Sequence, residues 1–261
     1  MRIVRHNKYI SQRKKRARIF ALVGFLLLST SLLIAWYPDY LLLAYVAMLS
    51  GFILFNMGMQ QVGKWTRNPR NDQILDIRMK SLSDRVTLVH YAQLGKHNIE
   101  HIAVHPGGLV LLTTKEVDGT IEKRKGRWRR KGGVFRRLFS FSGPQLGNPG
   151  FETEEGVKRV EAWLAEQQME VDVEGAIVFV HPGTELDIEE PDYPVLHGEE
   201  LPAFFHDLPA DPDFTTEERD RIVDLLAAGE SVEKENVQNQ GSRRPRPVKR
   251  VAAPKVKAKS Q

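Results

Sequence analysis

Two long apolar segments near the N-terminus dominate the pattern of hydrophobic and polar positions. Residues 19–36 carry no charged side chain, and residues 40–59 carry one strongly polar side chain, the amide of Asn56. At a rise of about 1.5 Å per residue, a helix of either length covers roughly the 30 Å of a bilayer core. The connection, residues 37–39, is too short for anything but a tight turn. The pattern therefore predicts a transmembrane hairpin.

Two alternatives to a membrane hairpin fit this pattern less well. A cleaved signal peptide needs small residues before the cleavage site, but residues 34–36 read Ile-Ala-Trp and a second apolar segment follows at once. A buried helical hairpin of a soluble protein seldom contains two uncharged segments of this length. Lys and Arg residues lie outside both spans, whereas the hairpin tip carries only Asp39. The positive-inside rule therefore places both ends in the cytoplasm.

Shorter periodic segments follow the hairpin. Apolar runs predict strands at residues 86–94, 99–104, 109–114 and 176–180, and an alternating basic stretch predicts a ribbon at residues 119–131. Helical spacing predicts helices at residues 71–82, 151–168, 198–205 and 215–228, the last with Thr215 as its N-cap. Together these elements predict a soluble domain of mixed helices and strands over residues 64–228.

Charge is strongly segregated along the chain. Residues 2–18 carry eight Lys and Arg and no acid, and residues 241–261 carry eight more, so the rest of a chain of net charge +5 sums to −11. We interpret residues 1–18 as a basic cytoplasmic N-terminus and residues 229–261 as a disordered basic tail, because the tail has little apolar surface to bury. That tail could contact its own acidic domain, anionic phospholipid or nucleic acid. The absence of cysteine excludes disulfides and a cysteine nucleophile.

One stretch carries the clearest indication of chemistry. Residues 98–115 read NIEHIAVHPGGLVLLTTK, and residues 118–121 read DGTI. This pattern resembles the nuclease-related domain, abbreviated NERD, whose core reads Asn-Ile-Asp-His, an apolar run, Gly, a second apolar run, Glu-Thr-Lys and Gly-x-Ile. The resemblance extends over about residues 71–206 and includes an Asn-Pro element at residues 148–149. It implies an α/β fold of the restriction-endonuclease-like group, a mixed sheet flanked by helices.

The resemblance also implies a metal-dependent catalytic site on two adjacent strands. In that group an acid and an acid-x-Lys element bind Mg²⁺, which activates water and neutralises charge on the scissile phosphate. Carried over to this chain, the catalytic positions are Asp72, Glu100, Thr113 and Lys115, and the metal ligands are Glu100 and Asp72. Residues two apart on a strand share a face, so we expect Thr113 and Lys115 to point together and Glu116 to point away.

Thr113 departs from the family pattern, which has a glutamate at this position. A neutral hydroxyl cannot supply the negative charge that holds a dication, although Glu152, near the Asn-Pro element, could refill the site. Two interpretations follow. The first is a catalytically degenerate module that binds nucleic acid or a partner at the cytoplasmic membrane face. The second is an active Mg²⁺-dependent nuclease with a rearranged acidic site. We expect His101 and His105 to serve packing rather than metal binding.

A basic stretch supplies the candidate nucleic-acid contacts. Its members are Lys123, Arg124, Lys125, Arg127, Trp128, Arg129, Arg130 and Lys131. Lys and Arg would neutralise phosphates, and the tryptophan would stack on a base. Anionic headgroups or an acidic partner would suit the same charges, and the tryptophan could instead pack on the core. Together with the hairpin, these features predict a two-span protein of a prokaryotic plasma membrane with a cytoplasmic soluble domain.

Overall fold

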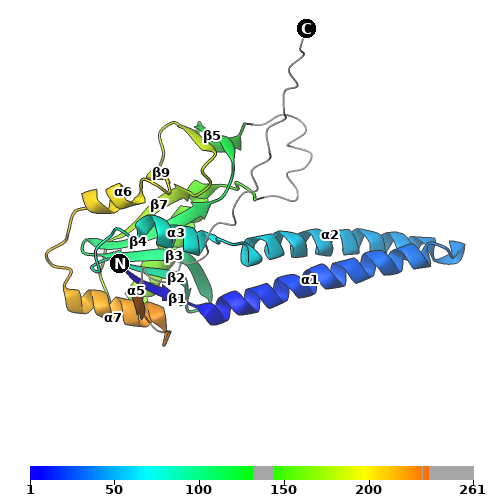
Figure 1. Ribbon diagram of the computed structural model, residues 1–261, viewed down its shortest axis with the longest axis horizontal. Coiled ribbons are helices and arrows are strands. Elements are labelled where there is room, and N and C mark those ends of the chain that lie inside the picture. The colour runs from blue at the N-terminus through cyan, green and yellow to red at the C-terminus, as the bar shows by residue number, and fades with distance from the viewer. Residues whose placement is uncertain (132–143, 231, 235–261) are drawn as a thin grey trace, which may run out of the picture.

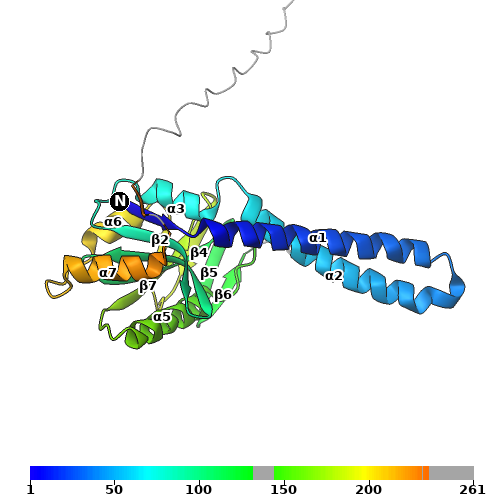
Figure 2. The same cartoon turned by 90° about the horizontal axis from the view of Figure 1, so that it is seen from below.

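The structure of the protein is a computed structural model that describes residues 1–131, 144–230 and 232–234. Most of the predicted basic tail, residues 229–261, lies outside the described residues. A globular domain of helices packed on a sheet carries one long helical hairpin, which projects from its side (Figures 1 and 2). This arrangement confirms the predicted mixed α/β fold, with a mixed sheet flanked by helices and preceded by two long apolar helices.

The main sheet contains both parallel and antiparallel neighbours. Strands β1 and β2, β4 and β7, and β7 and β9 run parallel, whereas β10 and β1, β2 and β3, and β3 and β4 run antiparallel. In spatial order the strands are β10 (Val232–Lys234), β1 (Arg2–Arg5), β2 (Thr87–Leu94), β3 (His97–His105), β4 (Gly108–Lys115), β7 (Val173–Phe179) and β9 (Val195–His197).

Helices cover both faces of this sheet because its central strands are apolar on both sides. Helices α5 (Pro149–Glu166) and α7 (Thr216–Ala227) pack on one face, and α3 (Asn71–Met79) and α6 (Leu201–Asp207) pack on the other. A smaller sheet of β6 (Arg127–Arg130), β5 (Gly119–Arg124) and β8 (Thr184–Ile188) packs against one end of the domain. As predicted, Thr215 caps α7, accepting a hydrogen bond from the backbone N–H of Glu218.

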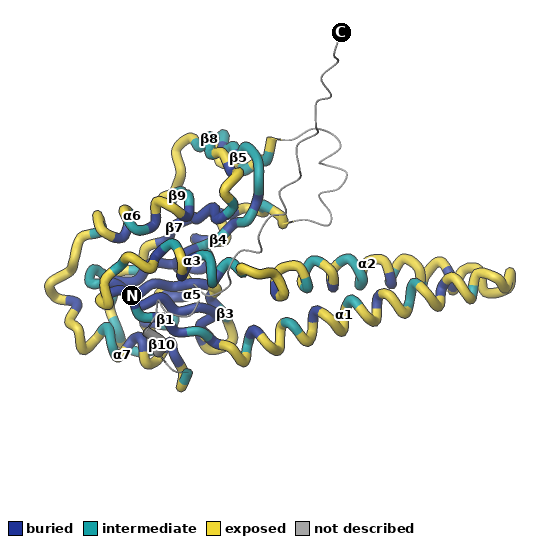
Figure 3. The backbone as a smooth tube through the Cα atoms, viewed as in Figure 1, coloured by how far each residue is buried: buried dark blue, intermediate teal, exposed yellow. Residues whose placement is uncertain are grey.

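The hairpin consists of α1 (Asn7–Ile34), the short 3₁₀ turn Pro38–Tyr40 and α2 (Leu41–Thr66). Only 17% of the most apolar window of each helix is buried, and many of its large apolar residues are exposed. Yellow, the colour of exposed residues, recurs along both helices (Figure 3). A core helix of a soluble protein would be mostly buried. Both helices are therefore candidate membrane spans, which agrees with the predicted hairpin.

Small residues bring the two helices of the hairpin into backbone contact. The buried positions recur every seven residues, at Ile10, Ala17, Gly24 and Ser31 of α1 and at Ala44, Gly51, Gly58 and Trp65 of α2. A seven-residue repeat keeps one seam facing the partner helix. Lipid offers no hydrophobic drive for helix pairing, so close packing through small residues is the expected source of stability.

The first residues of the chain are part of the domain. Strand β1 inserts between β2 and β10, with Ile3 opposite Leu88, and α1 begins two residues after β1 ends. The interpretation of residues 1–18 as a separate basic segment missed this strand. Consequently the first apolar helix is attached directly to the central sheet, with no flexible linker between them.

Candidate functional site

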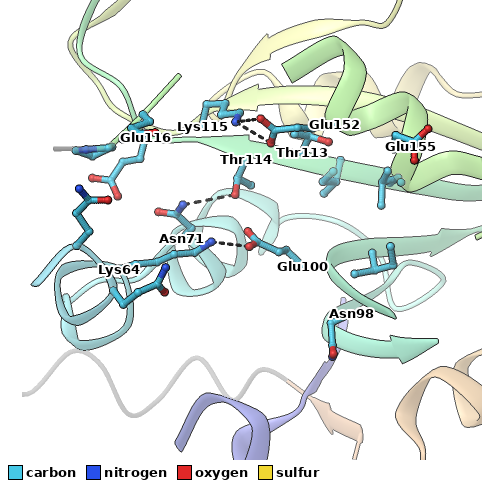
Figure 4. A pocket seen from close by; sticks show the side chains of 18 of the residues that line it. Lys64, Asn71, Asn98, Glu100, Thr113, Thr114, Lys115, Glu116, Glu152 and Glu155 are labelled. Atoms are coloured by element: carbon cyan, nitrogen blue, oxygen red, sulfur yellow. Dashed lines mark hydrogen bonds and ion pairs between the residues drawn. The ribbon is translucent and has the colours of Figure 1, made fainter. Parts of the chain in front are cut away.

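The site is a cavity that opens where two neighbouring strands separate. Residues of β3 and β4 pair as far as Ile102 and Leu111, and beyond this point Glu100 and Thr113 line a cavity of about 730 Å³. The end of α2, the start of α3 and the first turns of α5 complete its walls (Figure 4). The structure thus brings together Glu100, Thr113 and Lys115, three of the four catalytic positions that the resemblance implied.

Among the described residues, four acidic and four basic side chains line this cavity, and they form four ion pairs. The pairs are Lys64 with Glu100, Arg67 with Glu116, Lys115 with Glu152, and Arg159 with Glu155. Each carboxylate that faces the cavity therefore already has a cation beside it. The formal charge of the lining is zero, so the cavity attracts neither a dication nor a polyanion by net charge alone.

Lys115 is the most deeply buried charged residue of these four pairs. The Lys115 Nζ donates to both carboxylate oxygens of Glu152, at 2.7 and 2.8 Å, and Lys115 is only 8% exposed. Glu152 stands in the first turn of α5, whose N-cap Asn148 accepts a hydrogen bond from the N–H of Phe151. The left-handed Gly147 lies so close that a Cβ there would come within 2.6 Å of the Glu152 Oε1. Glu152, the acid that could refill the site, is thus paired with Lys115, whose positive charge neutralises it.

The Thr113 hydroxyl holds α5 against β4. The fully buried Thr153 donates to the carbonyl of Pro149 at 2.8 Å, and its single hydroxyl hydrogen is thereby used. The 2.7 Å contact between the two threonine hydroxyls therefore has Thr113 as its donor. Thr113, where the resemblance puts a glutamate, therefore takes part in the packing of α5 on β4.

Asp72, which the resemblance implied as a metal ligand, lies apart from this cluster. Its carboxylate is fully buried outside the cavity lining, where the Nε of Arg70 donates to it at 2.9 Å and the Nε of Arg5 lies 3.0 Å away. Burial alone would raise the pKa of Asp72, but the hydrogen bond from Arg70 and the nearby positive charges outweigh burial and lower it. Asp72 therefore anchors β1 and α3 to each other.

His101 and His105 are buried, as expected for packing residues. The Nε2 of His90 donates to Asp76 at 2.9 Å, and the Nδ1 atoms of His90 and His101 share a hydrogen bond of 2.8 Å. Burial, followed by the charge of His90, keeps the pKa of His101 well below its usual value. Burial lowers the pKa of His105 to about 4, and its Nδ1 accepts from the N–H of Gly107.

Glu116 lines the cavity, contrary to the expectation that it points away. Strand β4 ends at Lys115, so the alternation of side chains stops before this residue. The guanidinium of Arg67, just beyond the end of α2, pairs with the Glu116 carboxylate at the rim. Lys64 and Arg67 follow the second apolar segment in the sequence, and no local pattern marks either one as a site residue. The i,i+4 spacing of Glu155 and Arg159 was the one available signal for that pair.

The arrangement of Glu100, Glu152 and Lys115 in the cavity does not fit a Mg²⁺ ion. Among the described residues, no three acidic, His or Cys side chains come close enough to hold a metal ion. A Mg²⁺ ion would have to displace Lys64 from Glu100 or Lys115 from Glu152 before it could bind either carboxylate. The residues therefore favour salt bridges over metal coordination.

Acidic residues neutralise much of the predicted nucleic-acid-binding stretch. Lys123 is 3% exposed and pairs with Asp192, Arg124 pairs with Asp187, and Lys131 pairs with Glu122. Arg130 pairs with Asp118, and Trp128 packs on the core with its ring 6.3 Å from that of Phe179. Lys125, Arg127 and Arg129 are the members of the stretch that are exposed and form no ion pair with a described acid.

Comparison with known proteins identifies the region that holds this cavity. Residues 57–180 match the family model described as the nuclease-related domain, which confirms the resemblance found in residues 98–121. The matched region runs from the last turns of α2 to the end of β7 and contains the Lys64–Glu100 and Lys115–Glu152 pairs. No curated protein and no solved structure matches the chain.

Proposed function

We propose, from the premise that this chain carries a nuclease-related domain, that the protein is a membrane-anchored, catalytically degenerate module that binds nucleic acid without cleaving it. The observation that supports the loss of cleavage is the lining of the cavity. Every carboxylate there is paired with a cation, and Thr113 supplies no charge at the position where the family has a glutamate. Metal-dependent cleavage needs unpaired carboxylates.

The exposed cations of the ribbon are the nucleic-acid contacts in this proposal. Arg127 and Arg129 alternate on the edge strand β6, so their side chains lie on one face, and Lys125 precedes them in the turn. If these three cations meet three phosphates, the slope of log affinity against log salt should be roughly −3. Weak, salt-sensitive and sequence-independent binding is therefore expected, and a protein partner is the alternative occupant of this face.

The membrane placement is part of the same proposal. We place α1 and α2 as two spans of a prokaryotic plasma membrane, with the hairpin tip outside and both termini and the domain in the cytoplasm. The basic first turns of α1 and the Lys64 and Arg67 end of α2 lie on the same side as the domain, whereas the tip has Asp39 alone (Figure 1). The positive-inside rule favours this orientation.

The test uses the full-length protein in nanodiscs with labelled single- and double-stranded DNA and RNA, in the presence of Mg²⁺ or Mn²⁺. Three proteins are compared: the native chain, Thr113→Glu and Lys115→Ala. The proposal expects binding without cleavage by the native chain. A gain of cleavage in Thr113→Glu would show that the missing acid was the limiting group. Binding that survives a Lys125→Gln, Arg127→Gln, Arg129→Gln triple variant would refute the assignment of the ribbon.

A second candidate is an active Mg²⁺-dependent nuclease, which the approach of Glu152 to Lys115 favours. In this case Glu100 and Glu152 would bind Mg²⁺ once their lysines release them, and Lys115 would orient the attacking water. Cleavage by the native chain that disappears in both Lys115→Ala and Glu152→Gln would establish this function and exclude the degenerate one. Cleavage that persists in both variants would point to a contaminating nuclease.

A further inference from the structure

The first turns of α1 carry a group of cations that the fold leaves unpaired. Lys8, Arg13, Lys14, Lys15, Arg16 and Arg18 all lie on α1, and none is within ion-pair distance of a carboxylate of the described residues. The cations of the cavity and most of those of the ribbon, by contrast, have acidic partners. Within residues 1–131, 144–230 and 232–234, these α1 cations are therefore the largest group of Lys and Arg that no carboxylate pairs.

Three of these cations share one face of α1 with two apolar side chains. Lys14, Lys15 and Arg18 line a shallow groove of about 360 Å³, and Ile19 and Leu22 continue the same groove one turn further along the helix. Positions 14, 15, 18, 19 and 22 follow helical spacing, so they form one stripe. Ile19 is 48% exposed and Leu22 is 58% exposed, although both are large and apolar.

We infer that this groove binds one anionic glycerophospholipid, with its phosphate against Lys14, Lys15 and Arg18 and the start of an acyl chain along Ile19 and Leu22. Lys14 and Leu22 are eight residues apart, or about 12 Å along the helix axis, which spans a headgroup and the first carbons of a chain. A nucleic acid or free phosphate would use the cations but would leave the apolar end of the groove empty. The groove changes from cationic to apolar between Arg18 and Ile19, so it suits an amphiphilic ligand with an anionic head and an apolar chain.

The inference rests on the proposed placement of α1 in a bilayer but not on any nuclease activity. Each Lys or Arg near an anionic surface strengthens attraction by roughly fivefold, so three cations should favour an anionic over a zwitterionic headgroup by about two orders of magnitude. Snorkelling allows the long side chains to reach the phosphate while their stems stay on the apolar stripe.

Native mass spectrometry of the full-length protein in detergent micelles tests this site. Phosphatidylglycerol and phosphatidylcholine with identical acyl chains are added in separate titrations, and the bound fraction is measured. We compare the native chain with a Lys14→Gln, Lys15→Gln, Arg18→Gln triple variant. The matched control is a Lys80→Gln, Arg85→Gln, Lys96→Gln triple, which removes the same charge from exposed residues of the domain.

The site predicts at least tenfold weaker phosphatidylglycerol binding in the α1 triple and no change in the control triple. An Ile19→Ser, Leu22→Ser double variant should weaken binding of phosphatidylglycerol but not of inorganic phosphate. Equal retention of the two lipids, or equal losses in both triples, would overturn the inference. Displacement of the lipid by a short oligonucleotide would assign the cations to nucleic acid instead. Failure to retain either lipid would overturn it and contradict the proposed membrane placement as well.

Discussion

Gly58 allows the two helices of the hairpin to touch backbone to backbone, and Gly58→Ala tests that contact. A Cβ at this position would lie 2.6 Å from the Cα of Ala21 and 2.8 Å from the carbonyl carbon of Phe20. Ordinary contact needs about 3.5 Å or more, so α1 and α2 must move apart by close to 1 Å. Backbone atoms cannot rotate aside as a flexible side chain can.

The energy of this substitution has two opposing parts. Alanine is about 1 kcal/mol better than glycine in a helix, which favours the variant. Overpacking of a close contact typically costs 1–3 kcal/mol, and we expect about 3 kcal/mol here because backbone is the obstacle. The net effect of Gly58→Ala is thus about 2 kcal/mol of destabilisation, or roughly 4–8 °C in Tm at 2–4 °C for each kcal/mol.

Gly63 provides a matched control on the same helix. No heavy atom lies within 4 Å of the position where its Cβ would be, so Gly63→Ala gains helix propensity without a clash. We expect this variant to be about 1 kcal/mol more stable and to melt about 2–4 °C higher.

Thermal unfolding of the full-length chain in micelles, followed by far-UV circular dichroism, measures both shifts. The two Gly→Ala variants should move Tm in opposite directions. A rise in Tm for Gly58→Ala comparable with that of Gly63→Ala would refute the close helix contact, since propensity alone would then govern both positions.

Three further predictions concern titratable groups in buried surroundings. His105, with its pKa lowered to about 4, stays neutral when the folded domain meets acid while the unfolded chain takes up a proton near pH 6.5. Stability is therefore full above pH 6.5 and falls by about 3 kcal/mol between pH 6.5 and pH 4, and His105→Gln should flatten this part of a denaturant titration series. A double-mutant cycle of Lys115→Met and Glu152→Gln should give a coupling energy of about 1–3 kcal/mol. Asp72→Asn should cost about 3–5 kcal/mol in urea unfolding, because the largely buried Arg70 then lies beside a neutral amide.

Each of these three has an exposed counterpart in the same chain. His206→Gln, at a side chain that is 88% exposed, is the control for His105→Gln. The exposed i,i+4 pair of Lys158 and Glu154 should show a much smaller coupling energy, because water screens both charges. Asp220→Asn removes an exposed partner of Arg2 and should cost less than about 1 kcal/mol. Equal effects at buried and exposed positions would contradict the burial on which all three predictions depend.

The central elements could be predicted because each one is specified locally. The strands around residues 86–115 are apolar on both faces, and α5 and α7 begin at recognisable caps, Asn148 and Thr215. Strand β1 could not be predicted in this way. Its four residues read RIVR, and the hydrogen bonds that make them a strand come from β2, more than eighty residues later. Strands β8 and β9 lie in acidic stretches and pair only with distant partners.

The site was predictable in its strand positions but not in its electrostatics. The NERD-like pattern correctly brought Glu100, Thr113 and Lys115 to one cavity. It could not show that Lys64 would reach Glu100 from the far end of α2, or that Asp72 would be enclosed by Arg5 and Arg70. Ion pairs between residues far apart in sequence depend on the finished fold, which no local pattern encodes.

The attachment of the sheet to the hairpin also determines how far the cavity lies from the predicted second span. Met59 at the end of the predicted second span and Lys64 both line the cavity, and they are five residues, or about 7.5 Å, apart along α2. This distance is about one Debye length at physiological ionic strength. With the spans in a bilayer whose surface potential is about −30 mV, a dication is concentrated roughly tenfold at the headgroups and about twofold one Debye length away. The local concentration of a dication at the cavity would then depend on the lipid composition of the membrane as well as on the bulk solution.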